Sequence, residues 1–469
     1  MTGSTIGQGR PTGGRVVVVG GGLAGITAAL ACADAGREVT LLEERARLGG
    51  RTFSFRRGDL SVDNGQHVFL RCCTAYRALL DRLGVADGVI MQDRLDIPVR
   101  VPGQDKTYRL RRNGLPAPLH LGGSLLRYGP LAARQKASFI RAALAMRKLV
   151  RTDPATDART FGDWLVEHGQ DQRTIDAMWD LVGIATLNAR AGDASLALAA
   201  MVFQVGMLTD ASAADIGWAR VPLQELHGDA AALALSAAAV TVELNTPVTA
   251  LEPDATASQV AGGGTAGWTV RTARAEYAAD EVVLATPPDA AEKLLPEGAI
   301  ATPSGWAERL GTSPILNLHL VFDRKVMDGP FVAGVGTPIQ WVFDRTGTSG
   351  LSGDGQYLAV SVSAADGYID EPVPALRAAM LGHVEALLPG VLQAELLDFF
   401  VTRERSATFR PAPGTAALRA SARTSAPGLF LAGAWTDTGW PATMEGAVRS
   451  GNAAAAALLA RPVREGVAV

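Results

Sequence analysis

Eleven residues decide the fold of this 469-residue chain: Arg15-Val16-Val17-Val18-Val19-Gly20-Gly21-Gly22-Leu23-Ala24-Gly25. The valine run is typical of a strand buried on both faces of a parallel sheet. Three glycines follow it in the spacing G-x-G-x-x-G and open a helical pattern that continues to Ala35. The first permits a tight turn, the second lets a pyrophosphate approach the backbone, and the third allows close packing of helix on strand. With a second strand expected at Glu38–Leu42, the stretch predicts a βαβ unit that binds a dinucleotide.

The residues after the second strand narrow the kind of dinucleotide. Glu43 ends that strand, where a carboxylate accepts hydrogen bonds from ribose hydroxyls and disfavours the 2′-phosphate of NADP. The loop Leu48-Gly49-Gly50-Arg51-Thr52 follows, in which paired glycines let the chain pass near a cofactor and Arg51 offers a cation to phosphate. A domain that binds only NAD has no need for such a loop. An ordinary glycine loop with a surface arginine is the alternative, which the placement disfavours.

A second match to the glycine spacing, Gly262-Gly263-Gly264-Thr265-Ala266-Gly267, opens onto a strand and is interpreted as a hairpin loop. Strands are expected at 240–251, 268–274 and 277–285, and later at 315–322, 340–343, 358–363 and 429–432. A helix is expected at about 442–460, and a mostly helical insert at about 90–215. Pieces of the nucleotide-binding domain therefore come from separated parts of the chain.

Composition limits the partners and the compartment. A net charge of −3 argues against general nucleic-acid binding. Cys32, Cys72 and Cys73 cannot form an even disulfide framework, and they have no metal-ligand spacing, so reduced thiols in the cytoplasm are expected. Residues 1–14 are polar without the apolar core of a signal peptide, which predicts a disordered tail. No apolar run reaches the roughly 18 residues that span a bilayer.

Two distant segments together carry a family resemblance. Gly20–Gly25, Glu43 and Gly49-Gly50-Arg51 form one, and Leu431-Ala432-Gly433-Ala434-Trp435-Thr436 with Pro441-Ala442-Thr443-Met444-Glu445-Gly446-Ala447 form the other. They resemble the amine oxidase and carotenoid desaturase superfamily of FAD enzymes. The resemblance implies an α/β fold, with a Rossmann-like FAD-binding domain of the glutathione-reductase type and an interleaved α+β substrate domain. It implies that the C-terminal segment holds the ribityl chain and aims a helix N-terminus at the flavin.

The same resemblance implies which residues contact FAD. They are Gly20, Gly22, Leu23, Ala24, Gly25, Glu43, Glu44, Arg45, Gly49, Gly50, Arg51, Thr52, Gly65, Gln66, His67, Val248, Ala285, Thr286, Pro287, Gly433, Ala434, Thr436, Pro441, Ala442, Thr443 and Met444. Ala434 departs from the superfamily pattern, which usually has Asp or Glu there to bond the ribityl hydroxyls. Two alternatives follow: FAD binds more weakly, or Asp437 compensates for the missing carboxylate at position 434.

Within the superfamily the chain is most similar to the hydroxysqualene dehydroxylase group, also called squalene-associated FAD-dependent desaturases. The likeness spans the chain and includes Asp63-Asn64-Gly65-Gln66-His67-Val68, residues 179–188, Val221-Pro222-Leu223 with Gly228-Asp229, Ser363-Ala364-Ala365-Asp366, and Thr436-Asp437-Thr438-Gly439-Trp440-Pro441. The resemblance implies removal of the allylic hydroxyl of hydroxysqualene to give squalene for hopanoid or triterpene synthesis. Protonation of that hydroxyl would release water and leave a delocalised cation, which takes hydride from reduced flavin. A desaturase of carotenoid or dehydrosqualene type and a non-catalytic FAD-bound lipid carrier remain as alternatives.

His67 is the candidate acid, with Gln66 and Asp63 nearby, because superfamily analogy places this segment beside the flavin ring. A structural hydrogen-bonding role for His67 is the alternative. Residues 194–208 are almost wholly apolar and suit either a helix lining a tunnel for an isoprenoid or an ordinary core helix. The physiological electron donor has no signature in the sequence.

Residues 106–152 hold eleven Lys and Arg and no Asp or Glu. Within them, residues 131–151 sort into a basic side and an apolar side with Phe139, Met146, Leu149 and Val150. Such a helix either rests on the inner face of an anionic membrane or packs on the core. The expected division of the chain is FAD-binding at 15–90, 216–289 and 406–462, a helical substrate or membrane-facing insert at 91–215, and a substrate-domain sheet at 290–405.

Overall fold

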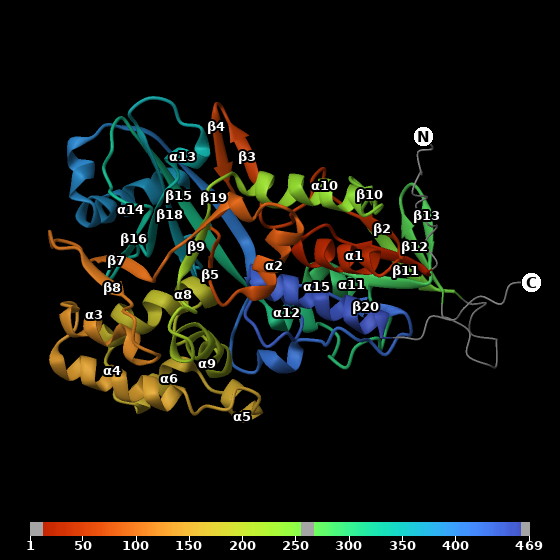
Figure 1. The fold of residues 1–469 in the computed structure, drawn as a ribbon, viewed down its shortest axis with the longest axis horizontal. Helices are drawn as coiled ribbons and strands as arrows, with labels where there is room; N and C mark the ends of the chain where they lie inside the picture. The colour runs from red at the N-terminus through yellow and green to blue at the C-terminus, as the bar shows by residue number, and fades with distance from the viewer. Residues whose placement is uncertain (1–12, 255–266, 461–469) are drawn as a thin grey trace, which may run out of the picture.

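The computed structural model describes residues 13–254 and 267–460. The molecule is elongated, with a parallel sheet and its helices in one half and a seven-stranded sheet with further helices in the other (Figure 1). Residues 1–12 of the expected N-terminal tail, and Gly262–Ala266 of the second glycine match, lie outside the described residues.

The parallel sheet is built from segments far apart in the chain. Its strand order is β10-β2-β1-β14-β20, with bounds Thr241–Glu243, Glu38–Leu42, Arg15–Val19, Glu281–Leu284 and Leu429–Leu431. All neighbouring pairs are parallel, so the carboxyl ends of the strands share one edge. The predicted βαβ unit is confirmed, with α1 at Leu23–Asp34 between β1 and β2. Its valines are buried on both faces, which stabilises the sheet by about 1.5–3 kcal/mol per side chain.

Helix α15 (Met444–Leu459) packs closely on α1. A methyl group at Gly451 would lie 2.3 Å from the carbonyl oxygen of Ala24, so only glycine permits this approach. The predicted C-terminal helix therefore exists, but it begins at Met444 rather than Ala442 because Thr443 caps it. Two more helices of this half are α2 (Thr74–Arg82) and α10 (Ala230–Ala237).

Two strands predicted as continuous are each divided between sheets. The segment 240–251 forms β10 and then β11 (Val248–Pro253), because Asn245 adopts a positive φ of 54° before Pro247. The segment 277–285 forms β13 (Glu276–Ala279) and then β14. Strands β11 and β13 flank β12 (Trp268–Thr272) in an antiparallel meander. The antiparallel pairing of β11 with β12 agrees with a hairpin loop at the second glycine match, which lies between them.

The seven-stranded sheet has the order β19-β15-β18-β17-β16-β7-β8. Its strands are Leu396–Phe409, Thr312–Phe322, Gln356–Ser363, Trp341–Asp344, Phe331–Gly334, Asp96–Arg100 and Tyr108–Arg111. Helix α14 (Val373–Leu387) packs on this sheet through Leu376, Met380 and Val384. The expectation that 91–215 is mostly helical omits β7 and β8, which join this sheet. Pairing of β7 with β16, more than two hundred residues later, makes this contribution invisible to local patterns.

Small sheets connect the two halves. Strands β3 (Ser54–Arg57) and β4 (Leu60–Asp63) form a hairpin, and β9 (Ile216–Ala219) lies between β5 (Val68–Leu70) and β6 (Val89–Met91). The remaining helices outside the insert are short: α11 (Pro288–Leu294), α12 (Trp306–Leu310) and α13 (Thr346–Ser349).

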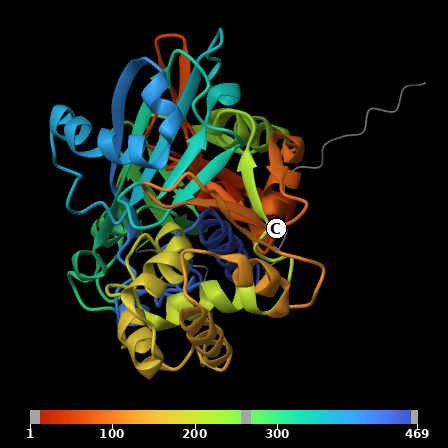
Figure 2. The ribbon, with the colours of Figure 1, turned by 90° about the vertical axis from the view of Figure 1, so that its left-hand side faces the viewer.

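The helices of the insert gather below the seven-stranded sheet when the molecule is seen from its left-hand end (Figure 2). They are α3 (Gly122–Arg127), α4 (Ala133–Met146), α5 (Pro154–Asp157), α6 (Phe161–Glu167), α7 (Gln172–Thr174), α8 (Asp180–Leu187) and α9 (Leu196–Phe203). Every residue of α9 is buried, and all except Ala197 belong to the main hydrophobic core, which supports the core-helix alternative over a tunnel lining.

The structure shows which side of helix α4 is buried and which side faces solvent. Phe139, Met146 and Leu149 of the predicted apolar side pack against the core, whereas Val150, the fourth residue of that side, is 61% exposed. Phe139 contacts Trp179, with ring centroids 4.8 Å apart. Ile140 and Leu144 are the apolar residues of α4 that face solvent, because they lie on the opposite side of the helix. Within 13–254 and 267–460, no helix is long and apolar enough to cross a membrane.

Candidate active site

The glycine turn at the end of β1 forms a cradle for an anion. A methyl group at Gly25 would lie 1.8 Å from the carbonyl oxygen of Gly20, so this glycine lets α1 sit directly on the turn. At Gly22 the equivalent position is open, with Gly50 Cα the nearest atom at 3.8 Å. Gly22 begins α1 without a side-chain cap, which leaves the first N–H groups of the helix for a bound phosphate. Leu23 and Ala24 follow as its first helical residues.

Glu43 fixes the turn against the second strand. Its Oε2 accepts a hydrogen bond from Gly21 N at 2.6 Å, and its Oε1 accepts one from Arg45 N at 2.8 Å. The carboxylate is buried at the carboxyl edge of the sheet, where a ribose lies in folds of this topology. Glu44 and Arg45 are exposed and form an ion pair with each other at 3.0 Å.

The loop after Glu43 runs alongside the glycine turn. Gly49 N donates to Gly21 O at 2.9 Å, and Gly50 has a positive φ of 59° with its Cα facing Gly22. Thr52 Oγ1 closes the loop by donating to Gly49 O at 2.8 Å. Arg51 donates to Ala407 O of β19 at 3.2 Å, so the loop bridges the two halves of the molecule. The predicted Gly49-Gly50-Arg51 segment therefore reaches the glycine cradle.

The C-terminal segment meets the same sheet edge. Gly433 follows β20 with a φ of 137°, and its N–H donates to Ser450 Oγ of α15 at 2.8 Å. Thr436 Oγ1 donates to Gly433 O at 2.9 Å. Pro441 and Ala442 precede Thr443, whose hydroxyl caps α15 by accepting from Gly446 N at 3.1 Å. The positive end of the α15 dipole therefore lies beside this segment.

Arg419 organises this segment and was missed by the sequence reasoning. Its buried guanidinium donates to the carbonyls of Trp435, Thr436 and Trp440 at 3.1, 2.6 and 2.7 Å. Burial lowers the pKa of Arg419 to about 10, which leaves it charged at neutral pH. A lone arginine outside any motif gives no signal of this role in one sequence.

Ala434 has no polar side chain to offer, and its carbonyl faces Arg419 at 3.5 Å. Asp437 is exposed, and its Oδ1 accepts a hydrogen bond from Gly439 N at 3.4 Å. Compensation for Ala434 by Asp437 stays a prediction.

Three buried polar atoms around the edge of the parallel sheet and β15 have no hydrogen-bond partner among the described residues. They are Gln66 Nε2, Thr286 Oγ1 and Asn317 Oδ1. Each such atom costs about 1–3 kcal/mol unless a ligand or water bonds it. Ala285, Thr286 and Pro287 lie just past β14, and Val248 is the first residue of β11. All four residues therefore lie in the half of the molecule that carries the cradle. The glycine cradle, Glu43 and these unpaired groups fit a dinucleotide that continues into a flavin.

The segment after β4 places His67 beside a buried ion pair. Asp63 Oδ1 accepts from Ser54 Oγ at 2.6 Å and from Leu223 N at 3.1 Å, while its Oδ2 pairs with Arg345. Asp63 is thus fully engaged as an acceptor, which suits a positioning role better than proton donation. Arg345 is the N-cap residue of α13 and lies 282 residues from Asp63 along the chain, so no local pattern connects the two.

Burial lowers the pKa of His67 to about 4, an effect that Asp63 opposes and Arg345 reinforces. His67 is therefore neutral near pH 7. Gly65 lies against it, since a methyl group there would be 3.3 Å from His67 Nε2. Next along the chain, β5 pairs Val68 with Trp218 of β9. Trp218 contacts Phe331, which contacts Trp341, so an apolar wall extends from the His67 segment along the seven-stranded sheet.

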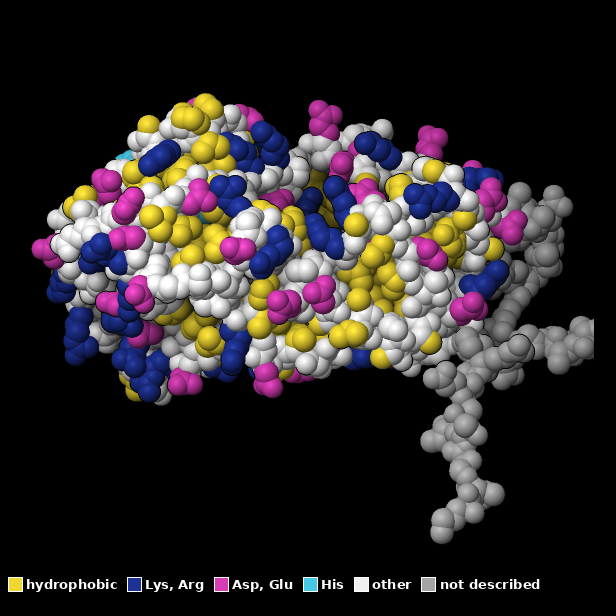
Figure 3. All heavy atoms as spheres, turned by 90° about the horizontal axis from the view of Figure 1, so that it is seen from above, with side chains coloured by type: hydrophobic (Ala, Val, Ile, Leu, Met, Phe, Trp, Pro, Cys, Tyr) yellow, Lys and Arg dark blue, Asp and Glu magenta, His cyan; other side chains and the backbone are white. Residues whose placement is uncertain are grey.

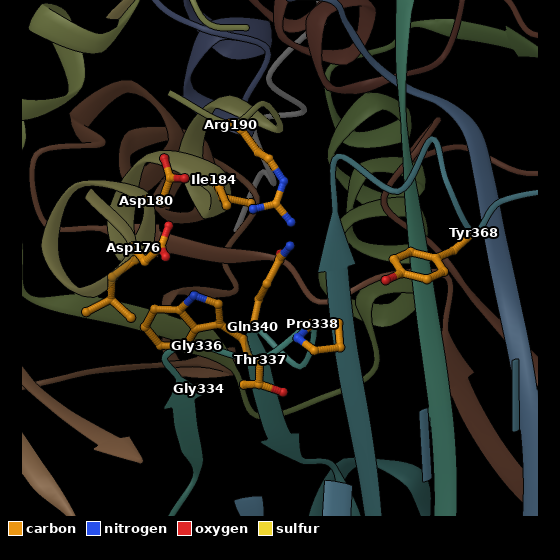
Figure 4. A pocket seen from close by; sticks show the side chains of 12 residues that line it. Asp176, Asp180, Ile184, Arg190, Gly334, Gly336, Thr337, Pro338, Gln340 and Tyr368 are labelled. Carbon is orange, nitrogen blue, oxygen red and sulfur yellow. The ribbon is translucent and has the colours of Figure 1, made fainter. Parts of the chain in front are cut away.

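A polar cavity of about 400 Å³ lies beyond this wall, between α8 and the β16–β17 turn. Figure 4 shows the side chains of Arg190 and Gln340 extending toward one another, with Asp180 and Asp176 on the helical side. Asp180 is buried, and its Oδ1 accepts from Ala191 N at 3.0 Å. Burial raises the pKa of Asp180 to about 6.

An Asp180→Asn variant is expected to be more stable than the parent at pH 7.5, by up to about 3 kcal/mol. The folded-state pKa lies above the unfolded value, so the folded protein holds this proton more tightly and loses stability as pH rises from about 4 to 6. Asparagine keeps the acceptor for Ala191 N without the charge. Urea unfolding at pH 7.5 measures the effect, with Asp59→Asn, at an exposed position of the β3–β4 turn, as the matched control. A less stable Asp180→Asn protein would contradict the argument.

The fold and this site define an FAD-dependent oxidoreductase. Residues 23–459 match the model of the family described as flavin-containing amine oxidoreductase, and the chain belongs to that family. It is 30% identical over 449 residues to a hydroxysqualene dehydroxylase of Rhodopseudomonas palustris, covering 95% of this chain and 98% of the relative. It is 26% identical over 503 residues to a zeta-carotene desaturase of Synechocystis sp., covering 97% and 99%. A solved triple mutant of putrescine oxidase shares the fold, with a TM-score of 0.71, 20% identity and 96% and 99% coverage.

These similarities confirm the predicted fold class, the FAD cofactor and the resemblance to the hydroxysqualene dehydroxylase group. The individual contacts of the predicted site residues with FAD, and the catalytic roles of His67, Gln66 and Asp63, stay predictions.

Proposed function

We propose that this enzyme removes the allylic hydroxyl of a hydroxysqualene-like isoprenoid to give the hydrocarbon, as a step of hopanoid or triterpene synthesis. The observation that carries the proposal is the similarity to hydroxysqualene dehydroxylase over 95% of the chain. The apolar wall of Val68, Trp218, Phe331 and Trp341 beside His67 supports it, because a hydrocarbon chain needs such a surface.

FAD would be held by the glycine cradle, by Glu43 and by the segment from Gly433 to Met444. When bound and reduced, it supplies the hydride that replaces the lost hydroxyl. The reaction then balances as alcohol plus reduced flavin giving hydrocarbon, water and oxidised flavin. The protein's own part is to exclude water, to orient the allylic carbon and to deliver one proton to the hydroxyl oxygen.

His67 is the proposed proton donor, and Gln66 a proposed hydrogen-bond donor through its unpaired Nε2. With a pKa of about 4, His67 carries a proton in about one molecule in a thousand at pH 7. The few protonated side chains are strong acids, so the rate of dehydroxylation is expected to rise about tenfold per pH unit from 7 toward 4, where the fold permits.

A His67→Ala variant is expected to lose about 10²–10⁴-fold in kcat and to lose this pH dependence, because the proton donor is gone. Single-turnover rates at pH 7.5, 6.5 and 6.0 measure both. His383→Ala, an exposed histidine on α14, is the matched control. FAD absorbance after purification verifies that the variant protein still binds its cofactor. A His67→Ala protein that binds FAD and keeps full turnover would remove His67 from the reaction.

The substrate is tested directly by anaerobic incubation of the dithionite-reduced enzyme with hydroxysqualene, followed by mass spectrometry. A product that lacks one oxygen atom is expected. The second candidate function is a desaturase, favoured by the similarity to zeta-carotene desaturase. A gain of double bonds when the oxidised enzyme meets squalene or phytoene would favour it. Retained lipid without turnover would favour the carrier.

A substrate of this kind is dissolved in the bilayer. We therefore also propose that the enzyme works as a peripheral protein on the cytoplasmic face of the cell membrane. The acid-free segment 106–152 supports this, because Lys and Arg near a surface attract anionic lipid.

A further inference from the structure

A basic groove of about 490 Å³ lies between β8 and α3. Six cationic side chains line it: Arg94, Lys106, Arg109, Arg111, Arg112 and Arg127. Its lining comes from β8, α3 and the loops beside them, and both β8 and α3 lie at the left-hand end of the molecule in Figure 1. Lys and Arg side chains also gather at this end in Figure 3, in the lower left corner of the view.

Half of these cations have no carboxylate partner among the described residues. Arg109 and Arg111 share Asp96, at 2.8 and 3.5 Å, and Arg112 bonds Asp215 at 2.6 Å. Arg94, Lys106 and Arg127 are exposed and form no such pair within the described chain. The groove therefore carries surplus positive charge that suits a phosphate group.

The groove is held in shape by a buried carboxylate. Asp215 is fully buried and bonds both Arg112 and Arg71, while its Oδ1 also accepts from Leu95 N at 2.6 Å. Arg112 in turn donates to Asp93 O at 2.8 Å. These bonds fix the segment that presents Arg94 against β8, so the floor of the groove is preformed.

Exposed apolar side chains occur in the same stretch of chain as the groove. Leu115, Leu119 and Leu126 are 51%, 61% and 76% exposed. Lys136 of α4 donates to Leu126 O at 2.8 Å, and Ile140 and Leu144 follow Lys136 at intervals of four residues, on the same side of the helix. Of the twelve large apolar side chains that are exposed in the described chain, six fall between Leu115 and Val150. Half of them therefore lie in this short basic segment.

We propose that this surface, residues 94–144 around the groove, docks on an anionic bilayer. Lipid phosphates would lie in the groove against Arg94, Lys106 and Arg127, while Leu115, Leu119 and Leu126 would enter the boundary between head groups and acyl chains. A surface that pairs cations with exposed leucines is complementary to lipid, whereas an RNA or DNA site would need no leucines. The biological purpose rests on the proposed function, since a bilayer supplies the isoprenoid, but vesicle binding requires no turnover and is tested apart from it.

The test is co-sedimentation of the FAD-loaded protein with vesicles of phosphatidylcholine containing 30 mol% phosphatidylglycerol, as an order-of-magnitude model of an anionic leaflet. Binding is expected at low salt, with a fall on raising the salt, and little binding to phosphatidylcholine alone. Removing the three unpaired cations in Arg94→Ala/Lys106→Ala/Arg127→Ala is expected to weaken binding about fivefold per side chain, about a hundredfold in all. Leu119→Asp/Leu126→Asp is expected to weaken it by about tenfold or more.

Matched variants elsewhere separate this surface from general charge or stickiness. Arg274→Ala removes an exposed arginine of the meander, and Leu233→Asp replaces a leucine of α10 that is 75% exposed. Both are expected to bind vesicles like the parent. Equal binding of the parent and the groove variant, or binding that leucine substitution leaves unchanged, would overturn the proposal. If the groove binds inorganic phosphate while the protein does not bind vesicles, the groove is a site for free phosphate. That result would also overturn the proposal.

Discussion

Replacing Gly25 with alanine is expected to abolish FAD binding. The added methyl carbon would lie 1.8 Å from the carbonyl oxygen of Gly20, where ordinary contacts begin at about 3.4 Å. Neither atom can move alone, because Gly20 is fixed by the strand and Gly25 by the first turn of α1. The helix must therefore shift away from β1, and its first N–H groups no longer point at the phosphates.

The ratio of flavin absorbance to protein absorbance after purification measures this loss, together with thermal unfolding of the apoprotein. Gly22→Ala is an informative companion, because its methyl group meets no protein atom closer than 3.8 Å. It is expected to keep the stability of the apoprotein and still lose FAD. Gly382→Ala, on α14 with open space around it, is the matched control that keeps both. Full FAD occupancy in Gly25→Ala would contradict the assignment of the cradle.

The apoprotein is expected to unfold steeply as pH falls from about 6.5 toward 4. Burial lowers the pKa of His67 to about 4 and those of His227 and His319 to about 3. His227 is tied to the Tyr76 hydroxyl at 2.8 Å, and His319 to the Tyr357 hydroxyl at 2.7 Å. In the unfolded chain each would take up a proton near pH 6.5. Because the unfolded state then binds more protons, stability is present above pH 6.5 and is lost as pH falls toward the folded values.

Three protons correspond to about 4 kcal/mol of unfolding free energy per pH unit. Asp180 acts in the opposite direction between pH 4 and 6, so the net slope there is about 3 kcal/mol per pH unit. Over two pH units this approaches the whole stability of a typical domain, about 5–15 kcal/mol. Tryptophan fluorescence during acid titration measures the transition, and neutralisation checks its reversal.

The Asp180→Asn variant provides the internal check on this slope. Without the opposing carboxyl, its stability is expected to fall more steeply below pH 6 than that of the parent. A free energy of unfolding that stays constant between pH 6.5 and 5 would show that the three histidines do not titrate as their burial requires.

Much of the cofactor site could be predicted because its information is local. The valine run, the glycine spacing and Glu43 lie within thirty residues, and steric demands on a glycine turn leave few other solutions. Resemblance supplied the second half, from Gly433 to Met444. Boundaries were less certain where a turn interrupts an apolar run, as at Asn245 and Asp280, because the period of burial continues while the partner strand changes.

The packing of α4 could not be predicted for a related reason. Hydrophobic periodicity predicts that one side of a helix is buried, but it does not predict whether that side packs on the protein core or on a membrane. Phe139 and Met146 satisfy that pattern by packing on the core. Of the exposed leucines near α3, only Leu126 lies in an α-helix, so helical periodicity does not describe them.

By itself, the sequence determined the βαβ unit and the glycine cradle, because chain neighbours and fixed spacings encode them. Its resemblance to known enzymes indicated FAD and the family. Only the tertiary structure decided which charges meet. It placed Arg345 on Asp63, Arg419 under the C-terminal segment and Asp180 on the wall of a polar cavity. It also gathered Arg94, Lys106 and Arg127 around one groove. The physical reason is that electrostatic partners interact through space over a few ångströms. Which residues come that close is fixed by strand order and helix packing across hundreds of residues.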